Sequence, residues 1–319
     1  MLGKLRGFNV PTLDDIDARE FSAAVPLTPE TIGFQEIRDC SKADDGHSAA
    51  AYNFHYYFQP KQPECAMILT DAKLTVTQVF GRPKTYPEYD RLMQPSDDGF
   101  VGFSAALVPN RGDHDPLSRF TAHKRMLEDE LDLQGEESPD GAFVRYEWIE
   151  GGVRMVIDLY NPTELPWLGN FASSFRKRLS NYTFVHYNGH SSYGTKNLLN
   201  DTESYSDGYQ IIVMHSCQSY AYYTRQVFRA KATANDASGH ALADVIATGK
   251  SLYPSGSPPT LRVLLSGLMD GMVAIDQGRP DRAPDWLTIA EEMKSSTWGD
   301  ILYGVAGVRK NTWKPESVW

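Results

Sequence analysis

The sequence has little cysteine and no long hydrophobic segment. Its 319 residues include three cysteines, too few for a disulfide framework. Cys40 and Cys65 can pair and leave Cys217 alone, but three reduced cysteines fit equally well. No apolar run reaches the ~18–20 residues of a membrane span. The first residues (MLGKLRGFNVPTLDD) lack the apolar segment of a signal peptide, so we expect a cytoplasmic protein, or a secreted or periplasmic one if a leader was removed.

Basic residues are also in the minority. The chain has 31 Lys and Arg against 41 Asp and Glu, a formal net charge of −10. Because nucleic acids and anionic membranes select basic surfaces, we do not expect either as a partner. The sequence has no P-loop, no GxGxxG after a strand and no GxSxG elbow, so nucleotide-binding and serine-hydrolase functions lack their signals, and no cofactor is expected.

One acidic cluster resembles a set of metal ligands. Asp113, His114 and Asp115 are consecutive. Adjacent residues on a loop rarely converge on one ion, and no ligand spacing such as HExxH follows. We therefore predict no metal site.

Residues 134–141 (QGEESPDG) are polar and rich in turn formers. They mark a change from short strand-like segments to a longer alternation of strands and helices. We expect a β-rich N-terminal region of unknown role, residues 1–142, and an α/β domain, residues 143–319, with a mostly parallel sheet covered by helices on both faces. In the first region, strands are expected at 51–58, 66–69, 74–80 and 99–108, and a helix at 116–133. In the second, strands are expected at 153–159, 184–187, 211–214, 244–248 and 301–305, and helices at 170–179, 219–231, 259–275 and 289–293.

Two strand-like runs end in clusters of small, polar and reactive residues. The first, YTFVHYNGHSSYG at residues 182–194, delivers His190, and the second, YQIIVMHSCQSY at 209–220, delivers Cys217. The gap of 27 residues (217 − 190) suffices for one strand–crossover–strand return. Two parallel neighbouring strands would then present an imidazole and a thiol at the same carboxyl edge of a sheet, where open α/β sheets place their chemistry. A thiol beside an imidazole can carry out covalent acyl transfer.

The neighbours of this pair suit that chemistry. Gly189, Ser191 and Ser216 are small, so we expect backbone N–H groups at these positions to bind an oxyanion. A helix beginning just past Cys217 would favour the thiolate form. The alternatives are a buried structural cysteine and a loop histidine bonded to nearby backbone.

Two further histidines compete for the role of base. His186 lies inside the first strand, where packing or a structural hydrogen bond is the simpler interpretation. His215 precedes Cys217 by two residues and can share a sheet face with it. We rank His190 ahead of both.

The chain resembles the clan CD cysteine peptidases, the caspase-like fold, and within them the gingipain-type branch. Their pattern is an apolar strand ending in Gly-His-Gly/Ser, followed by an apolar strand ending in a small residue and Cys. Residues 189–191 match the first part and residues 213–217 match the second, with His215 where such a strand usually stays apolar or small. The resemblance covers roughly residues 150–310.

The resemblance implies a hydrolase acting on a peptide or protein substrate, a thiol protease with a Cys–His dyad. Cys217 would attack the acyl carbonyl, His190 would protonate the leaving amine, and water would hydrolyse the thioester. Substrate-binding residues are not assigned. Asp201, Glu203 and Asp207 could attract a basic side chain of the substrate, although a solvated acidic loop is the simpler interpretation.

Two other functions fit the same sequence. One is a catalytically silent member of the fold that binds or scaffolds other proteins. The other is an unrelated α/β protein acting on carbohydrates, in which the N-terminal region binds the ligand and Cys217 has no role. Reactivity of the Cys217 thiol separates these from the peptidase.

Overall fold

The computed structural model describes most of the chain after residue 85. The described residues are 4–5, 8–9, 68–69, 86–95, 101–109, 116–162, 171–191, 199, 202–217, 219–248, 254–297, 303–307 and 313. The strands expected at 51–58 and 74–80 and the possible Cys40–Cys65 pair lie outside these residues. β1 (Lys4–Leu5) and β2 (Phe8–Asn9) form a two-stranded antiparallel sheet.

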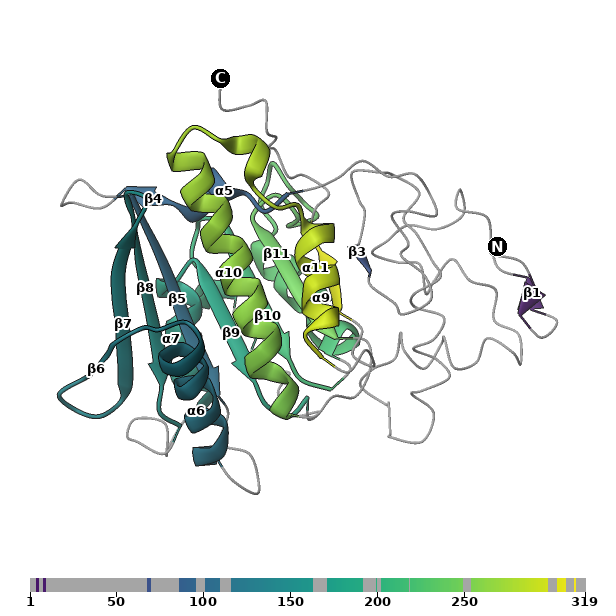
Figure 1. Ribbon diagram of the computed structural model, residues 1–319. Coiled ribbons are helices and arrows are strands. Elements are labelled where there is room, and N and C mark those ends of the chain that lie inside the picture. The colour runs from purple at the N-terminus through teal and green to yellow at the C-terminus, as the bar shows by residue number, and fades with distance from the viewer. Residues whose placement is uncertain are drawn as a thin grey trace.

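A mixed sheet lies at the centre of the described structure (Figure 1). Its middle is five parallel strands, in spatial order β8 (Val153–Tyr160), β5 (Val101–Pro109), β9 (Phe184–Asn188), β10 (Gln210–His215) and β11 (Ala243–Thr248). Antiparallel strands flank it: β7 (Phe143–Glu150) and β6 (Gly135–Glu137) beyond β8, β12 (Tyr303–Ala306) and β3 (Ile68–Leu69) beyond β11, and β4 (Gln94–Pro95) on β5. The predicted α/β architecture with a parallel sheet is confirmed for this centre, whereas the edges are antiparallel.

Burial explains where the strands lie. Every residue of β9, β10 and β11 is buried, as strands covered on both faces require, and their sequences are correspondingly apolar. The central part of β7 alternates buried and exposed residues, which is typical of an antiparallel strand near a sheet edge.

Helices cover both faces of the sheet (Figure 1). α6 (Pro116–Arg125), α10 (Ser257–Asp276) and α11 (Trp286–Ser295) pack on one face, and α7 (Phe171–Asn181) and α9 (Ser219–Lys231) on the other. α10 begins with Pro258 in its first turn, and it buries a stripe that includes Leu261, Leu264, Leu268 and Met272. Among the described residues, no helix has both the length and the apolarity to cross a bilayer.

The order of the strands defines one functional edge. Numbered along the chain, the five parallel strands have the spatial order 2-1-3-4-5, so the order reverses between β5 and β9. In open α/β sheets, ligands bind outside the carboxyl ends of the strands beside such a reversal. β5 and α6 precede the predicted boundary at 142–143, and the β6–β7 hairpin crosses it.

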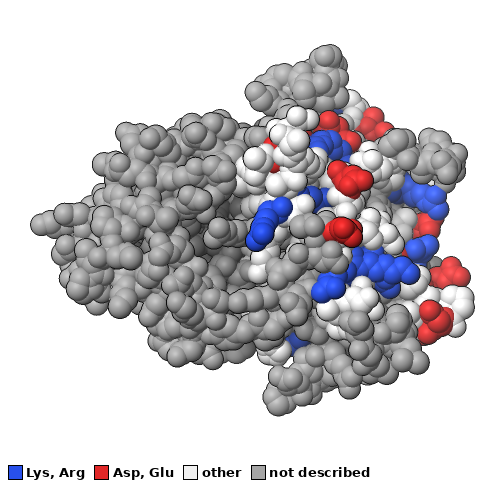
Figure 2. All heavy atoms as spheres, turned by 180° about the vertical axis from the view of Figure 1, so that it is seen from behind, with Lys and Arg blue, Asp and Glu red and all other residues white. Residues whose placement is uncertain are grey.

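Figure 2 shows the molecule from the side opposite to that of Figure 1. On this face the basic and acidic side chains of the described residues are interspersed. The basic residues of α7 include Arg176, Lys177 and Arg178, of which Lys177 is exposed.

Candidate functional site

The loops that carry His190 and Cys217 leave the sheet side by side. In the parallel register of β9 and β10, Asn188 lies opposite His215. The Gly189 N–H donates to the His215 carbonyl oxygen at 3.2 Å, which extends the pairing one residue past β9. His190 and Cys217 each follow this register pair by two residues, and adjacent strands lie about 4.8 Å apart. The structure thus places both residues at the same carboxyl edge.

Side-chain contacts join and order the two loops. The Ser191 hydroxyl donates to Ser216 Oγ at 2.7 Å. The Tyr187 hydroxyl donates to the His190 carbonyl oxygen at 2.8 Å and fixes the backbone there. His190 is exposed, and Cys217 is half-buried. Both reactive groups can therefore meet a substrate at this edge.

The Cys217 loop is also anchored to β11. Ser219, the first residue of α9, donates from Oγ to the Met214 carbonyl oxygen at 2.5 Å and accepts from the Thr248 N–H at 2.8 Å. The Thr248 hydroxyl donates to the Ser216 carbonyl oxygen. Cys217 thus precedes the start of α9 by two residues, where the positive end of the helix macrodipole favours an anion.

Two of the N–H groups expected to bind an oxyanion already have partners. The Gly189 N–H bonds to His215, as above, and the Ser216 N–H donates to the Met214 carbonyl oxygen at 3.0 Å. The Ser191 hydroxyl is engaged by Ser216. The small residues at these positions therefore pack the two loops together, and the expected role of Gly189 and Ser216 as oxyanion donors needs correction.

Three buried imidazoles lie on the sheet face covered by α6 and α10. His123 comes from α6, His186 from β9 and His215 from β10, and we call them the histidine layer. The ring centroids of His123 and His186 are 5.4 Å apart, and those of His186 and His215 are 6.0 Å apart. Each residue is 1% exposed, so neither His186 nor His215 is positioned to touch a peptide substrate.

Hydrogen-bond directions fix the tautomers of His123 and His186 in their neutral forms. His123 Nδ1 lies 2.7 Å from the Arg119 carbonyl oxygen, which can only accept, so Nδ1 carries the proton. His123 Nε2 therefore accepts from the Ser257 hydroxyl at 3.1 Å. Since that hydroxyl has one proton, Ser257 Oγ accepts from His186 Nε2 at 3.2 Å. His186 Nδ1 is consequently unprotonated.

The same argument assigns His215. The Thr260 hydroxyl donates to the Gly256 carbonyl oxygen at 2.9 Å and accepts from the Tyr303 hydroxyl at 3.0 Å. Tyr303, having donated its proton, accepts from His215 Nδ1 at 3.2 Å. His215 Nε2 is therefore the unprotonated nitrogen of this ring.

The histidine layer and the neighbouring Asn188 contain polar atoms without partners. Among the described residues, His186 Nδ1, His215 Nε2 and both amide atoms of Asn188 are buried and make no hydrogen bond. Burial lowers the pKa of His123 to about 4 and of His215 to about 3, and it lowers the pKa of His186 well below the usual range. The layer is neutral at pH 7. No local sequence pattern points to Ser257, which lies 71 residues from His186.

The acidic residues expected near a substrate lie at the other edge of the sheet. Glu203, in a 3-10 turn (Thr202–Ser204), and Asp207 are exposed and precede β10, whereas Cys217 follows it. The five steps from Gln210 to His215 span roughly 17 Å. Glu203 and Asp207 are therefore poorly placed to hold a substrate side chain at Cys217, and Asp201 lies outside the described residues.

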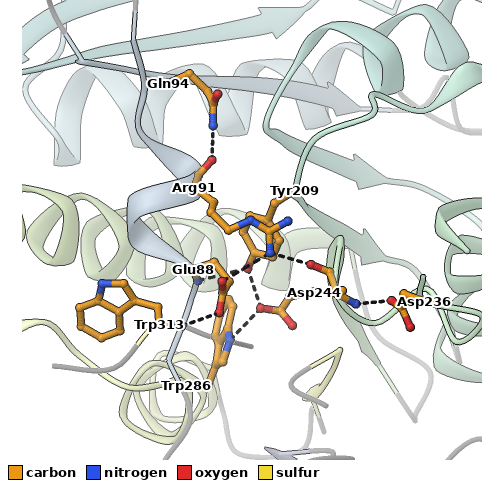
Figure 3. A network of polar contacts seen from close by, with 9 residues as sticks. Glu88, Arg91, Gln94, Tyr209, Asp236, Asp244, Trp286 and Trp313 are labelled. Atoms are coloured by element: carbon orange, nitrogen blue, oxygen red, sulfur yellow. Dashed lines mark hydrogen bonds and ion pairs between the residues drawn. The ribbon is translucent and has the colours of Figure 1, made fainter. Parts of the chain in front are cut away.

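A second buried polar network lies at this amino edge (Figure 3). The Tyr209 hydroxyl and the Trp286 indole N–H donate to Asp244 Oδ2 at 2.6 and 3.1 Å. Glu88 accepts from the backbone N–H of Trp313 at 2.9 Å and from the Arg91 guanidinium at 3.4 Å. These contacts involve Tyr209 just before β10, Asp244 in β11, Trp286 in α11 and the segment before β4. Their place at the amino ends of the strands indicates a structural role.

Within the described part of the chain, no three His, Cys, Asp or Glu side chains are grouped so that they could hold a metal ion. Residues 113–115 lie outside that part. A scan against protein-family models gave no match for this chain, and searches of curated proteins and of solved structures gave none either.

Proposed function

We propose that this protein is a cysteine peptidase that cleaves peptide bonds through a thioester on Cys217. One observation carries the proposal: adjacent parallel strands place a half-buried thiol and an exposed imidazole on two loops joined by the 2.7 Å Ser191–Ser216 hydrogen bond. The resemblance of both strand ends to clan CD peptidases supports the same assignment. The proposed catalytic domain is residues 143–319 together with β5 and α6, which complete its sheet and helix layers.

The proposed reaction has two halves. In the first, the Cys217 thiolate attacks the peptide carbonyl carbon, and the electron pair of the C=O bond moves to oxygen. The intermediate collapses with cleavage of the C–N bond, and His190 gives a proton to the leaving amine. In the second, water attacks the thioester, His190 takes a proton from it, and the product acid leaves with regeneration of the thiolate.

Of the oxyanion donors first expected, this proposal keeps the Ser191 N–H and replaces the other two. Because the Gly189 and Ser216 N–H groups are committed within the protein, we assign the role to the backbone N–H groups of Ser191 and Cys217. Both belong to the joined loops, so the contact between Ser191 and Ser216 also sets the spacing of these donors. Preorganised donors of this kind typically contribute 10²–10³ in kcat each.

A catalytically silent binding protein is the second candidate. The committed N–H groups of Gly189 and Ser216 favour it, since a silent site needs tight loop packing and no free donors. Its substrate would be held but not cleaved.

Cleavage of a fluorogenic peptide library with every side chain at P1, using the full chain, tests the proposal. We expect at least one P1 class to be cleaved, with kcat/KM falling more than 10³-fold in Cys217→Ala and more than 10²-fold in His190→Ala. His240→Ala serves as the control, because His240 is stacked on Phe228 away from the site. A peptide electrophile should add its mass at Cys217. Cleavage that persists in Cys217→Ala would overturn the proposal. Binding of a library peptide without its cleavage, and without reaction of the electrophile at Cys217, would identify the silent alternative.

A further inference from the structure

The histidine layer has no role in the proposed reaction, yet it adjoins the two strands that carry the dyad. His215 immediately precedes Ser216, and Asn188 immediately precedes Gly189. His186 and Asn188 belong to β9, and His215 lies opposite Asn188 in β10. The layer therefore sits at the carboxyl ends of β9 and β10.

This end of the sheet is poorly satisfied in hydrogen bonding. The unpartnered atoms of His186, His215 and Asn188 are four buried polar atoms on two adjacent strands. A buried polar group without a partner is destabilised relative to its hydrated state. Local opening that exposes these atoms to water recovers part of that cost, which makes this end a preferred place for the sheet to open.

Charge around the layer opposes protonation while the sheet is closed. α6 contributes His123 and Arg119, whose positive charge acts on both His123 and His215. The other packed elements contribute neutral groups: Ser257 and Thr260 from α10, and the Tyr303 hydroxyl from β12. Within the described part of the chain, no carboxylate is among the groups that shift the pKa values of these three imidazoles. The described groups around a proton entering the closed layer are therefore neutral or positive.

We propose that His186 and His215 form a proton-uptake site whose protonation opens the carboxyl ends of β9 and β10. In the open state each imidazole is hydrated and titrates near pH 6.5. Below that pH, each exposed histidine raises the opening equilibrium constant up to tenfold per pH unit. With two histidines, the opening equilibrium constant therefore rises by up to nearly two decades for each pH unit. Acid thus separates the loops of His190 and Cys217 before the whole fold is lost, whether or not the protein cleaves peptides.

Hydrogen–deuterium exchange of the full chain between pH 7.5 and 5 tests the inference, with rates corrected for intrinsic exchange. At pH 5, peptides covering residues 184–191 and 210–217 should lose at least tenfold more protection than peptides covering β7 and β8. In His215→Gln, the slope of the logarithm of the opening equilibrium constant against pH should fall by about one decade per pH unit. The control His240→Gln replaces another buried imidazole and should keep the wild-type slope.

Equal loss of protection in both regions, or an unchanged slope in His215→Gln, would overturn the inference. If His215→Gln does not fold, ring-labelled histidine NMR of the wild-type protein decides. We expect the signals of two buried imidazoles to leave their neutral positions together as the protection of residues 210–217 falls. Signals that stay neutral while that protection falls would refute the proton-uptake site.

Discussion

Ser191 donates its hydroxyl hydrogen bond to Ser216 at 2.7 Å, and this contact joins the loop after β9 to the loop after β10. The backbone bond from Gly189 to His215 lies next to it. The relative position of His190 and Cys217 therefore depends on a short chain of contacts at the end of two strands. The proposed peptidase needs that geometry, since a misplacement of about 1 Å can cost 10²-fold in rate.

Ser191→Ala should weaken the proposed activity more than it weakens the fold. We expect the free energy of unfolding to fall by about 1 kcal/mol, because a typical hydrogen bond is lost, and kcat/KM to fall at least tenfold. Urea denaturation and peptide cleavage measure the two quantities. Ser216→Ala should act similarly, and the double variant should cost less than the sum of the single ones. Strict additivity of the two changes would show that the contact does not couple the loops.

Acid should destabilise the whole protein through the histidine layer. The folded-state pKa of His123 is about 4 and that of His215 about 3, both below the unfolded value of about 6.5. The unfolded state therefore binds more protons, so stability is fully present above pH 6.5 and is lost as the pH falls toward these folded values. At pH 5 the loss is roughly 2 kcal/mol for His123 alone. Urea titrations at pH 7.5 and 5 measure it, and equal midpoints would contradict the assignment of neutral buried rings.

Asp244→Ala should damage the fold without touching the site. The substitution leaves the Tyr209 hydroxyl and the Trp286 N–H buried without their shared acceptor, so we expect a loss of about 3–5 kcal/mol. Tyr209→Phe removes this donor and also the acceptor of the Glu88 backbone N–H at 3.4 Å, and should cost about 1–3 kcal/mol. Thermal unfolding checks both. Folded Tyr209→Phe should retain the Cys217 alkylation rate of the wild type, and a large change in that rate would place this network in the functional site.

Much of the fold could be predicted from the sequence where signals are local. The helix expected at 219–231 has those bounds in α9, and the apolar runs before His190 and Cys217 are β9 and β10. The spacing of 27 residues predicted adjacent parallel strands, because a crossover of that length has few other ways to return.

The remaining features depend on contacts that no local pattern encodes. β5 lies at the centre of the sheet between β8 and β9, although it precedes both and lies before the predicted boundary. The His215–Tyr303 bond spans 88 residues, and the His123–Ser257 bond spans 134. The Gly189 and Ser216 N–H groups donate to backbone carbonyl oxygens because of the way the two loops pack. The small size of these residues does not by itself determine that packing.

The alkylation rate of Cys217 by iodoacetamide from pH 5 to 9, in the native protein and in His190→Ala, tests the central claim most directly. Peptide mass analysis assigns the modification to Cys217 and separates it from Cys40 and Cys65. We predict that Cys217 is alkylated in the folded wild type and that its rate falls at least fivefold in His190→Ala, because an adjacent imidazole activates a thiol nucleophile. A Cys217 thiol that stays inert until the protein unfolds, or one whose pH profile is the same in both proteins, would contradict a Cys–His dyad at this edge of the sheet.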